Sequence, residues 1–590
     1  MERPASPRAR NLVELLQFSC RRYATRPLLG TRREGQWHWL SYREVGALVD
    51  QARAGLAGLG VRPGDRVAII GDNSIEWMVA AYAVYGLGAI FVAMHLAQTP
   101  REWEFILRDC GARVVIAGSE AIGRALHGKR GALPELQHIV SLGSSEAAGS
   151  WRALLTTGAA APVAPSSPDP DAIATFIYTP GTTGNPKGVR LSHRNLMASL
   201  DVATAVFAFA PADRSVAFLP WAHIFVQLCD LHLIVGNGGS IALNDEPRRL
   251  FLNLIEVKPT FLVAVPGIFN RVYQAIKNEL GGRADVVAET VHGKGASAAD
   301  STRQMLLQTI RDRFGGRLRY AVCGSTSLGS EVIELLEAAG ISMVEGYGLT
   351  EASAIITTST MGRRQRGSVG RVVRGVRVVI DDTVRGVEGH GEIVVYGAGV
   401  MAGYHDRPDD ERRALMPDGG LRTGDLGRFD DDGFLYLAGR LEDQQQLDSG
   451  TYLAPGPLED ALKCSPYIAN VMIYADGRPH SVALVMPHAS SIRNWADDHG
   501  VKLGDDLAAD EAVRQLIATE VERLSTELRG FERPRAIAVL GQGFTVDNGL
   551  LTPTLRIRRR EVVSRHRAML ESLYAGHGVR ISTPASRDTS

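Results

Sequence analysis

The chain has 590 residues, which is too long for one hydrophobic core, so we expect more than one domain. Hydrophobic residues make up 45% of the chain and charged residues 22%, as is ordinary for a globular protein. Lysine plus arginine equals aspartate plus glutamate at 65 each, so the charge balance predicts no nucleic-acid partner.

The cysteines and the apolar runs indicate the cellular compartment and whether the chain associates with a membrane. The five cysteines include no CxxC pair, which is typical of reduced, mostly buried thiols in a cytoplasmic protein. No apolar segment follows the arginines and prolines of the first ten residues, so we expect no secretory signal. The longest uncharged run, residues 78–94, contains a Gly-Leu-Gly break and falls short of a bilayer span. It predicts a buried helix running into a buried strand, no transmembrane segment, and at most peripheral membrane contact.

Along the chain, apolar segments with helical spacing alternate with short β-rich runs. The clearest β-rich runs are residues 66–70, 112–117 and 260–265. Such alternation indicates an α/β protein with parallel sheets. The Ala-, Pro- and Ser-rich residues 159–170 predict a connector.

A loop rich in glycine and threonine follows the apolar run 172–177. Glycines let backbone N–H groups approach an anion, threonine hydroxyls donate further hydrogen bonds, and a lysine adds a mobile positive charge. The spacing differs from a Walker loop, and a surface turn is the alternative explanation. The residues predicted to hold phosphates are Thr179, Gly181, Thr182, Thr183, Gly184 and Lys187.

A second motif, residues 346–351, follows the apolar run 341–344. After Gly346, the Tyr347 ring can stack on adenine, Thr350 can hydrogen-bond the α-phosphate, and the Glu351 carboxylate can hold Mg²⁺. Taken alone, a tyrosine between glycines is more often a turn with an anchoring ring.

A third motif spans residues 422–427 and is followed by a segment that ends at residue 440. The Asp425 carboxylate can accept hydrogen bonds from ribose hydroxyls, and Arg440 can add a ribose or phosphate contact. Solvated turn chemistry is sufficient for residues 430–433.

The three motifs, in this order, resemble those of the AMP-forming adenylating superfamily: acyl-CoA synthetases, luciferases and peptide-synthetase adenylation domains. The resemblance runs from about Asn11 to about Tyr574, and residues 218–225 and 258–266 resemble the long-chain acyl-CoA synthetase branch. It implies an α/β fold with a large N-terminal adenylation domain of layered α/β sheets, residues 1–440, which binds ATP and substrate. A smaller, mobile α+β C-terminal domain, residues 441–590, would follow a hinge at Asp443.

The resemblance also implies roles for two further residues. His223 would lie between the nucleotide and the acyl pocket as a gate, although a lone histidine is usually structural. Gly324 would contact adenine, on a weaker match than the other motifs.

The chain departs from the family at three places. Arg556 stands where related enzymes carry a catalytic lysine, in a basic run whose other members we expect to be solvated. Pro180 replaces a serine, which removes one N–H and one hydroxyl. The loop 444–455 keeps Ser449 and Gly450 but is otherwise rewritten. These changes suggest that ATP activation is retained while the acid or the acceptor step is altered.

Three hypotheses follow. The first is an ATP-dependent, AMP-forming ligase that uses Mg²⁺ to activate a long-chain fatty or aryl acid as an acyl-adenylate, with CoA as acceptor. The second is a secondary-metabolism diazotase that activates nitrite with ATP for coupling to an aryl amine. The third is a non-catalytic nucleotide-binding relative. In the first, Arg556 would clamp the charge that develops at the α-phosphate.

Overall fold

The protein is described from a computed structural model, which covers residues 9–143, 149–179, 185–279, 298–324, 328–359, 362–384, 386–526, 528–552 and 556–581. The chain divides into two compact units. Unit 1 comprises Met1–Val378 and Val395–Arg422, and unit 2 comprises Val379–Val394 and Thr423–Ser590.

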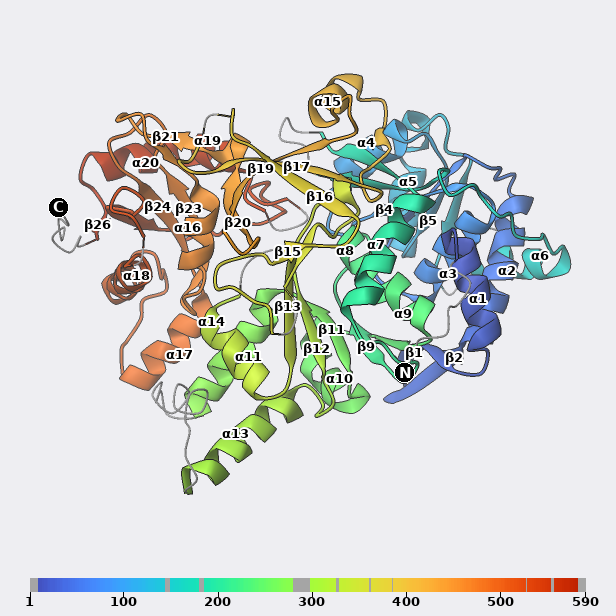
Figure 1. Cartoon of the computed structure of the whole chain (residues 1–590), viewed down its shortest axis with the longest axis horizontal. Coiled ribbons are helices and arrows are strands. Elements are labelled where there is room, and N and C mark those ends of the chain that lie inside the picture. The colour runs from blue at the N-terminus through green and yellow to red at the C-terminus, as the bar shows by residue number, and fades with distance from the viewer. Residues whose placement is uncertain are drawn as a thin grey trace. The chain divides into compact units, whose positions relative to one another are not determined.

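Unit 1 contains a seven-stranded, mostly parallel sheet (Figure 1). Its strands, in spatial order, are β18 (Gly403–Tyr404), β8 (Lys187–Ser192), β7 (Ile173–Thr179), β4 (Ile90–Met94), β3 (Arg66–Ile70), β5 (Ala112–Ala117) and β6 (His138–Ser141). The strands β7, β4, β3, β5 and β6 are parallel, whereas β8 and β18 are antiparallel to their neighbours. The predicted strands 66–70 and 112–117 are confirmed as β3 and β5.

The uncharged run 78–94 forms the buried helix and strand that its composition predicts. Helix α3 (Ile75–Gly86) begins at Ser74, whose side chain accepts a hydrogen bond from the Trp77 N–H. Gly88 adopts φ +65°, which favours glycine, and β4 follows. Since α3 is buried nearly all round, its sequence is apolar without a polar face.

Unit 1 contains two further sheets. One has the order β11 (Phe261–Ala264), β12 (Tyr320–Cys323), β13 (Ser342–Tyr347), β14 (Thr357–Thr358), β15 (Arg371–Val372), and β11 confirms the predicted strand 260–265. The other has the order β2 (Gln36–Ser41), β1 (Pro27–Arg33), β10 (Ser240–Leu243), β9 (Arg214–Ala217). The longer helices of unit 1 include α1 (Leu12–Arg22), α2 (Tyr42–Gly58), α4 (Pro100–Asp109), α5 (Glu120–His127), α6 (Trp151–Ala160), α7 (His193–Val206), α10 (Leu250–Val257), α11 (Pro266–Glu279), α13 (Ala298–Arg313) and α14 (Ser330–Ala338).

Unit 2 is built around a smaller sheet in the order β23 (Ile468–Tyr474), β24 (Val482–Pro487), β25 (Ala536–Val539), β26 (Val579–Arg580). Its helices include α16 (Pro455–Leu462), α17 (Ala489–His499), α18 (Glu511–Leu524), α19 (Arg559–Arg565) and α20 (Arg567–Tyr574). The short hairpin of β21 (Gln445–Gln446) and β22 (Tyr452–Leu453) precedes α16.

A four-stranded sheet carries the boundary between the units within its own strands. Its order is β16 (Val376–Asp381), β17 (Gly391–Gly397), β19 (Leu421–Phe429), β20 (Leu435–Arg440). The first three of these strands contain residues of both units. The hinge at Asp443 and the division at residues 440 and 441 remain predictions.

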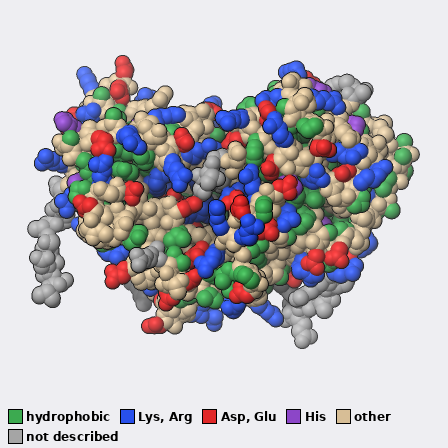
Figure 2. Space-filling model, turned by 90° about the horizontal axis from the view of Figure 1, so that it is seen from above, with side chains coloured by type: hydrophobic (Ala, Val, Ile, Leu, Met, Phe, Trp, Pro, Cys, Tyr) green, Lys and Arg blue, Asp and Glu red, His purple; other side chains and the backbone are tan. Residues whose placement is uncertain are grey.

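The surface and the thiols agree with the composition. Figure 2 shows Lys, Arg, Asp and Glu side chains interspersed over the face in view, as an equal balance of charges predicts. None of the five cysteines, all of which lie in the described ranges, forms a disulfide; three are buried, Cys20 is partly buried and Cys464 is exposed. Within the described ranges, no helix combines the length and the apolar character needed to cross a membrane.

Candidate active site

The base of the threonine-glycine loop is an antiparallel strand pair in unit 1. Thr179, the last residue of β7, lies opposite Lys187, the first residue of β8. This pairing fixes both ends of the loop and places the threonine and the lysine side by side. The predicted phosphate ligands Gly181, Thr182, Thr183 and Gly184, and the substitution at Pro180, lie outside the described residues.

Lys187 belongs to a polar network that reaches the predicted metal ligand. Its Nζ lies 2.9 Å from Asp410 Oδ1 and 5.5 Å from the centre of the Tyr404 ring. The Tyr404 hydroxyl in turn donates a hydrogen bond of 2.9 Å to Glu351 Oε1. Tyr404 therefore connects two residues that the sequence predicts to act on phosphate and on Mg²⁺. Neither Tyr404 nor Asp410 was a predicted site residue.

The second motif is a strand end followed by a tight turn. Gly346 and Tyr347 end β13, and Thr350 and Glu351 begin the 3₁₀ turn Thr350–Ala352. Gly346 is required by packing, because a Cβ there would lie 2.6 Å from the Thr357 carbonyl oxygen. The Tyr347 side chain is buried, whereas Thr350 and Glu351 are partly exposed, so both polar side chains remain accessible to a ligand.

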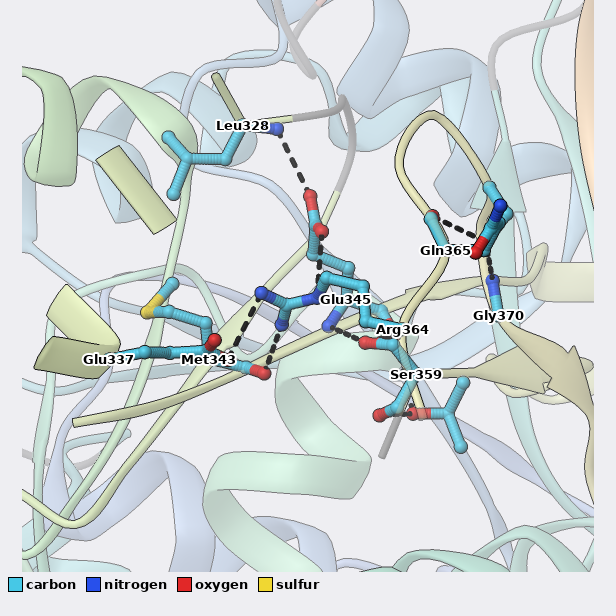
Figure 3. Close-up of polar contacts among 10 residues, drawn as sticks. Leu328, Glu337, Met343, Glu345, Ser359, Arg364, Gln365 and Gly370 are labelled. Carbon is cyan, nitrogen blue, oxygen red and sulfur yellow. Dashed lines mark hydrogen bonds and ion pairs between the residues drawn. The ribbon is translucent and has the colours of Figure 1, made fainter. Parts of the chain in front are cut away.

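Behind this motif lies a polar cluster centred on Glu345 (Figure 3). Glu345 Oε1 accepts a 3.1 Å hydrogen bond from the Leu328 N–H, and Glu345 Oε2 lies 3.8 Å from Arg364 Nε. Arg364 also lies 3.1 Å from Glu337, and burial raises the pKa of the Glu345 carboxyl. The cluster ties Leu328 to β13. Glu345 was not a predicted site residue, although an acid directly before the Gly346-Tyr347 motif is a signal.

Gly324 and His223 are brought together by packing. A Cβ at Gly324 would lie 2.7 Å from the Phe225 ring, so only glycine allows this approach. Phe225 lies in the short helix Ile224–Val226, for which His223 is the N-cap residue. The short helix that follows His223 therefore packs against Gly324 through Phe225. The roles of Gly324 toward adenine and of His223 toward the acid remain predictions.

The third motif lies in unit 2 from Thr423 onward. Asp425 and Arg440 face each other across β19 and β20, and Arg440 Nε lies 3.0 Å from Asp425 Oδ1. The Asp425 N–H donates to the Thr423 hydroxyl, which donates to the Ile393 carbonyl. The pair holds the Asp425 carboxylate in place. Since a carboxylate can accept several hydrogen bonds, the pairing leaves capacity for the predicted ribose contact.

Arg556 and its neighbour Arg559 differ in environment. Arg556 is exposed; its N–H donates a 3.0 Å hydrogen bond to the Thr552 hydroxyl, and its carbonyl accepts a 2.8 Å bond from the Thr552 N–H. Arg559 is instead paired with Glu459 at 2.9 and 3.0 Å, donates to the Ile473 carbonyl, and lies 3.9 Å from Asp443. The expectation of a solvated run beyond Arg556 is wrong for Arg559, because the carboxylate of Glu459 compensates its burial.

The rewritten loop after Asp443 also has a structural reason. The Gln445 side chain is buried, and its Nε2 donates to the Ile473 carbonyl at 3.3 Å. Gly450 has φ +85° in the turn of the hairpin, a conformation that favours glycine. Gln445 therefore anchors the hairpin on β23.

Comparison with known proteins assigns the chain to one family. Over residues 16–405, about two thirds of the chain, the sequence matches the family described as AMP-binding enzyme. A long-chain-fatty-acid–CoA ligase, FadD15 of Mycobacterium bovis, is 29% identical, with 92% of this chain and 93% of that protein aligned.

Two solved structures share the fold. The adenylation domain of a carboxylate reductase from Mycobacterium chelonae superposes with a TM-score of 0.79 at 24% identity, covering 97% of this chain and 92% of that one. The o-succinylbenzoate coenzyme A synthetase of Bacillus subtilis, in complex with ATP and a magnesium ion, gives a TM-score of 0.67 at 21% identity, covering 92% and 98%. They confirm the expected α/β fold. The chain belongs to the AMP-binding enzyme family.

Proposed function

We propose that the protein is an ATP-dependent, AMP-forming ligase that activates a long-chain fatty acid as an acyl-adenylate and transfers the acyl group to CoA. The observation that carries the proposal is the family match across residues 16–405, which contains Lys187 and Glu351. The long-chain-fatty-acid–CoA ligase from M. bovis, aligned over most of both chains, supports the choice of acid and acceptor.

In the first step, a carboxylate oxygen of the acid attacks the α-phosphorus of ATP. The bond from that phosphorus to the oxygen bridging to the β-phosphorus breaks, and pyrophosphate leaves. Thr179 and Lys187 would bind the phosphates at the base of the loop, and Thr350 would donate to the α-phosphate. Tyr347 would support adenine, and Asp425 and Arg440 the ribose. Charge neutralisation at the phosphates would be the main contribution of Lys187.

The residues present fit a magnesium ion that arrives with the nucleotide. Glu351 offers a partly exposed carboxylate whose orientation is fixed by Tyr404. Among the described residues, no three His, Cys, Asp or Glu side chains converge to hold a metal by themselves. One carboxylate combined with phosphate and water oxygens is a common Mg²⁺ environment. When bound, the ion would neutralise charge on the departing pyrophosphate.

In the second step, the CoA thiol loses its proton and its sulfur attacks the acyl carbon. The carbon–oxygen bond to the phosphate breaks, and AMP leaves. Arg556 would stabilise the charge that develops in the first step, and the chain would hinge at Asp443 between the steps. The guanidinium retains the charge of the lysine found in related enzymes, with a wider, planar geometry.

A panel of acids tests the proposal. AMP and pyrophosphate release would be measured with Mg²⁺-ATP and CoA against long-chain fatty acids, aryl acids, and nitrite with an aryl amine. We expect release with long-chain fatty acids, together with formation of their CoA thioesters. Release with nitrite and the amine alone would favour the diazotase hypothesis, and ATP binding without turnover on any substrate would favour the non-catalytic one. Nothing in the described residues favours either alternative.

A further inference from the structure

The predicted phosphate-binding lysine already has an anion as its partner. Lys187 Nζ lies 2.9 Å from the Asp410 carboxylate, and both side chains are about four-fifths buried, at 21% and 22% exposure. The other ion pair of Asp410 is longer, at 3.8 Å to Arg413, whose side chain is 78% exposed. Lys187 is therefore the principal counter-charge of Asp410.

The segment that carries Asp410 is held in place by several contacts. Strand β18 pairs with β8, with Tyr404 opposite Val189. The His405 N–H donates 2.8 Å to the Gly188 carbonyl, and the His405 ring nitrogen Nε2 lies 2.9 Å from the Asp109 carbonyl. These bonds fix the chain just before α15 (Pro408–Ala414), in whose first turn Asp410 lies.

The neighbouring acid fixes the helix itself. Glu411 accepts the Tyr404 N–H at 2.9 Å and pairs with Arg190 of β8 at 3.3 Å. Since β8 begins at Lys187, the strand that presents the lysine and the helix that presents Asp410 are tied together. The Lys187–Asp410 pair is thus a fixed feature of unit 1 and differs from a mobile surface ion pair.

We propose that Asp410 is a positioning residue that holds Lys187 while no nucleotide is bound. Its carboxylate occupies the place beside Lys187 that an oxygen of the terminal ATP phosphates would take, so these phosphates must displace the carboxylate when ATP binds. The inference rests on the proposed function, because it needs Lys187 to bind a polyphosphate. The carboxylate offers the lysine the same charge-assisted hydrogen bond that a phosphate oxygen offers. A bound polyphosphate would also experience repulsion from this negative charge.

The competition has a consequence for nucleotide selectivity. Competition between Asp410 and phosphate for Lys187 weakens the binding of ligands whose phosphates reach this lysine, such as ATP and pyrophosphate. AMP lacks the β- and γ-phosphates, so its binding is unaffected. Asp410 therefore weakens ATP binding relative to AMP binding. The negative charge of Asp410 would also favour the release of pyrophosphate, because the Asp410–Lys187 ion pair forms again as pyrophosphate leaves.

The test is direct binding of ATP, pyrophosphate and AMP, measured by calorimetry on the full chain without acid or CoA. Asp410→Asn removes the charge and keeps the shape, and Asp410→Ala provides a second variant. We expect each to lower the Kd for ATP and pyrophosphate about two- to fivefold, the scale of a partly exposed ion pair, with the Kd for AMP unchanged. Asp409→Asn is the matched control, because the Asp409 side chain is 75% exposed and pairs only with Arg412 among the described residues.

A double-mutant cycle makes the test specific. In a Lys187→Ala background, Asp410→Asn should no longer tighten ATP binding, because the lysine for which the two anions compete is gone. If Lys187→Ala weakens ATP binding while Asp410→Asn leaves it unchanged or weakens it, the inference is overturned and the proposed function stands. If the wild-type protein binds no ATP, both are overturned.

Discussion

The Tyr404 hydroxyl donates a hydrogen bond to Glu351 across 2.9 Å, so a residue of β18 orients the carboxylate predicted to hold Mg²⁺. Tyr404→Phe removes this one bond and keeps the ring that lies beneath Lys187. A hydrogen bond to a charged group contributes about 1.5–3 kcal/mol, so we expect adenylation at limiting Mg²⁺ to fall about tenfold or more. The rate would be measured as a function of Mg²⁺ concentration.

The dependence on Mg²⁺ separates this role from general damage to the fold. For Tyr404→Phe, the Mg²⁺ concentration at half-maximal rate should rise, and high Mg²⁺ should restore much of the activity. Tyr436→Phe is a suitable control, because its hydroxyl donates to Asp430 in unit 2, whereas Glu351 lies in unit 1. An equal fall in rate at every Mg²⁺ concentration would contradict a role through Glu351.

Arg556 is predicted to supply positive charge to the transition state of adenylation. Arg556→Ala should lower the rate of acyl-adenylate formation about 100-fold or more, the usual effect of removing one electrostatic contact to a developing charge. Arg556→Lys should retain more activity than Arg556→Ala because the charge remains. Pyrophosphate release in a single turnover measures the step. Arg560→Ala, which removes an exposed arginine from the same run, is the control and should be silent. Full activity in Arg556→Ala would assign the task to another residue.

The Arg559–Glu459 pair is predicted to stabilise unit 2. Both groups are largely buried, with side-chain exposures of 15% and 7%. Removing one member of such a pair leaves an uncompensated charge and typically costs about 3–5 kcal/mol. Arg559→Ala should therefore accelerate hydrogen exchange at the amides of β23 and β24, measured on the full chain. Unchanged protection there, as expected for Arg560→Ala, would show that the pair contributes little.

Asp230 gives a pH dependence with a defined sign. Burial raises the pKa of its carboxyl from 3.8 to about 6, and its oxygens accept bonds from the Ser215 hydroxyl and the Trp221 indole. The folded state therefore holds this proton more tightly than the unfolded state, so the contribution of Asp230 to stability falls as pH rises between these two values. A difference of this size corresponds to at most about 3 kcal/mol.

Urea unfolding across that pH range measures the effect. Asp230→Asn should flatten the fall in the free energy of unfolding, while the exposed-turn variant Asp432→Asn should reproduce the wild-type profile. If Asp230→Asn shows the same fall as the wild-type protein, the dependence arises from other groups.

Much of the fold can be predicted from the sequence because it depends on local pattern. The runs 66–70 and 112–117 are apolar and β-rich, and they form adjacent parallel strands. The motif residues Lys187 and Glu351 are recognisable because their chemistry requires particular residue types at short spacing. Both patterns are readable within a few neighbouring positions.

The sequence does not predict which residues contact each other when they are far apart along the chain. Asp410 and Tyr404 lie more than 200 residues from Lys187 along the chain and reach it only because β18 pairs with β8. Arg559 and Glu459 are 100 residues apart, so the run of arginines by itself suggests a solvated face. Such pairings depend on strand order, which local spacing does not specify.

The most direct test of the proposed chemistry follows the oxygen of the acid. A long-chain fatty acid labelled with ¹⁸O in its carboxylate would be incubated with the protein, Mg²⁺-ATP and CoA, and the AMP analysed by mass spectrometry. Attack of the carboxylate on the α-phosphorus predicts AMP that carries one labelled oxygen, formed in equal amount with the acyl-CoA. Unlabelled AMP, or ADP and phosphate in its place, would contradict activation of the acid as an acyl-adenylate.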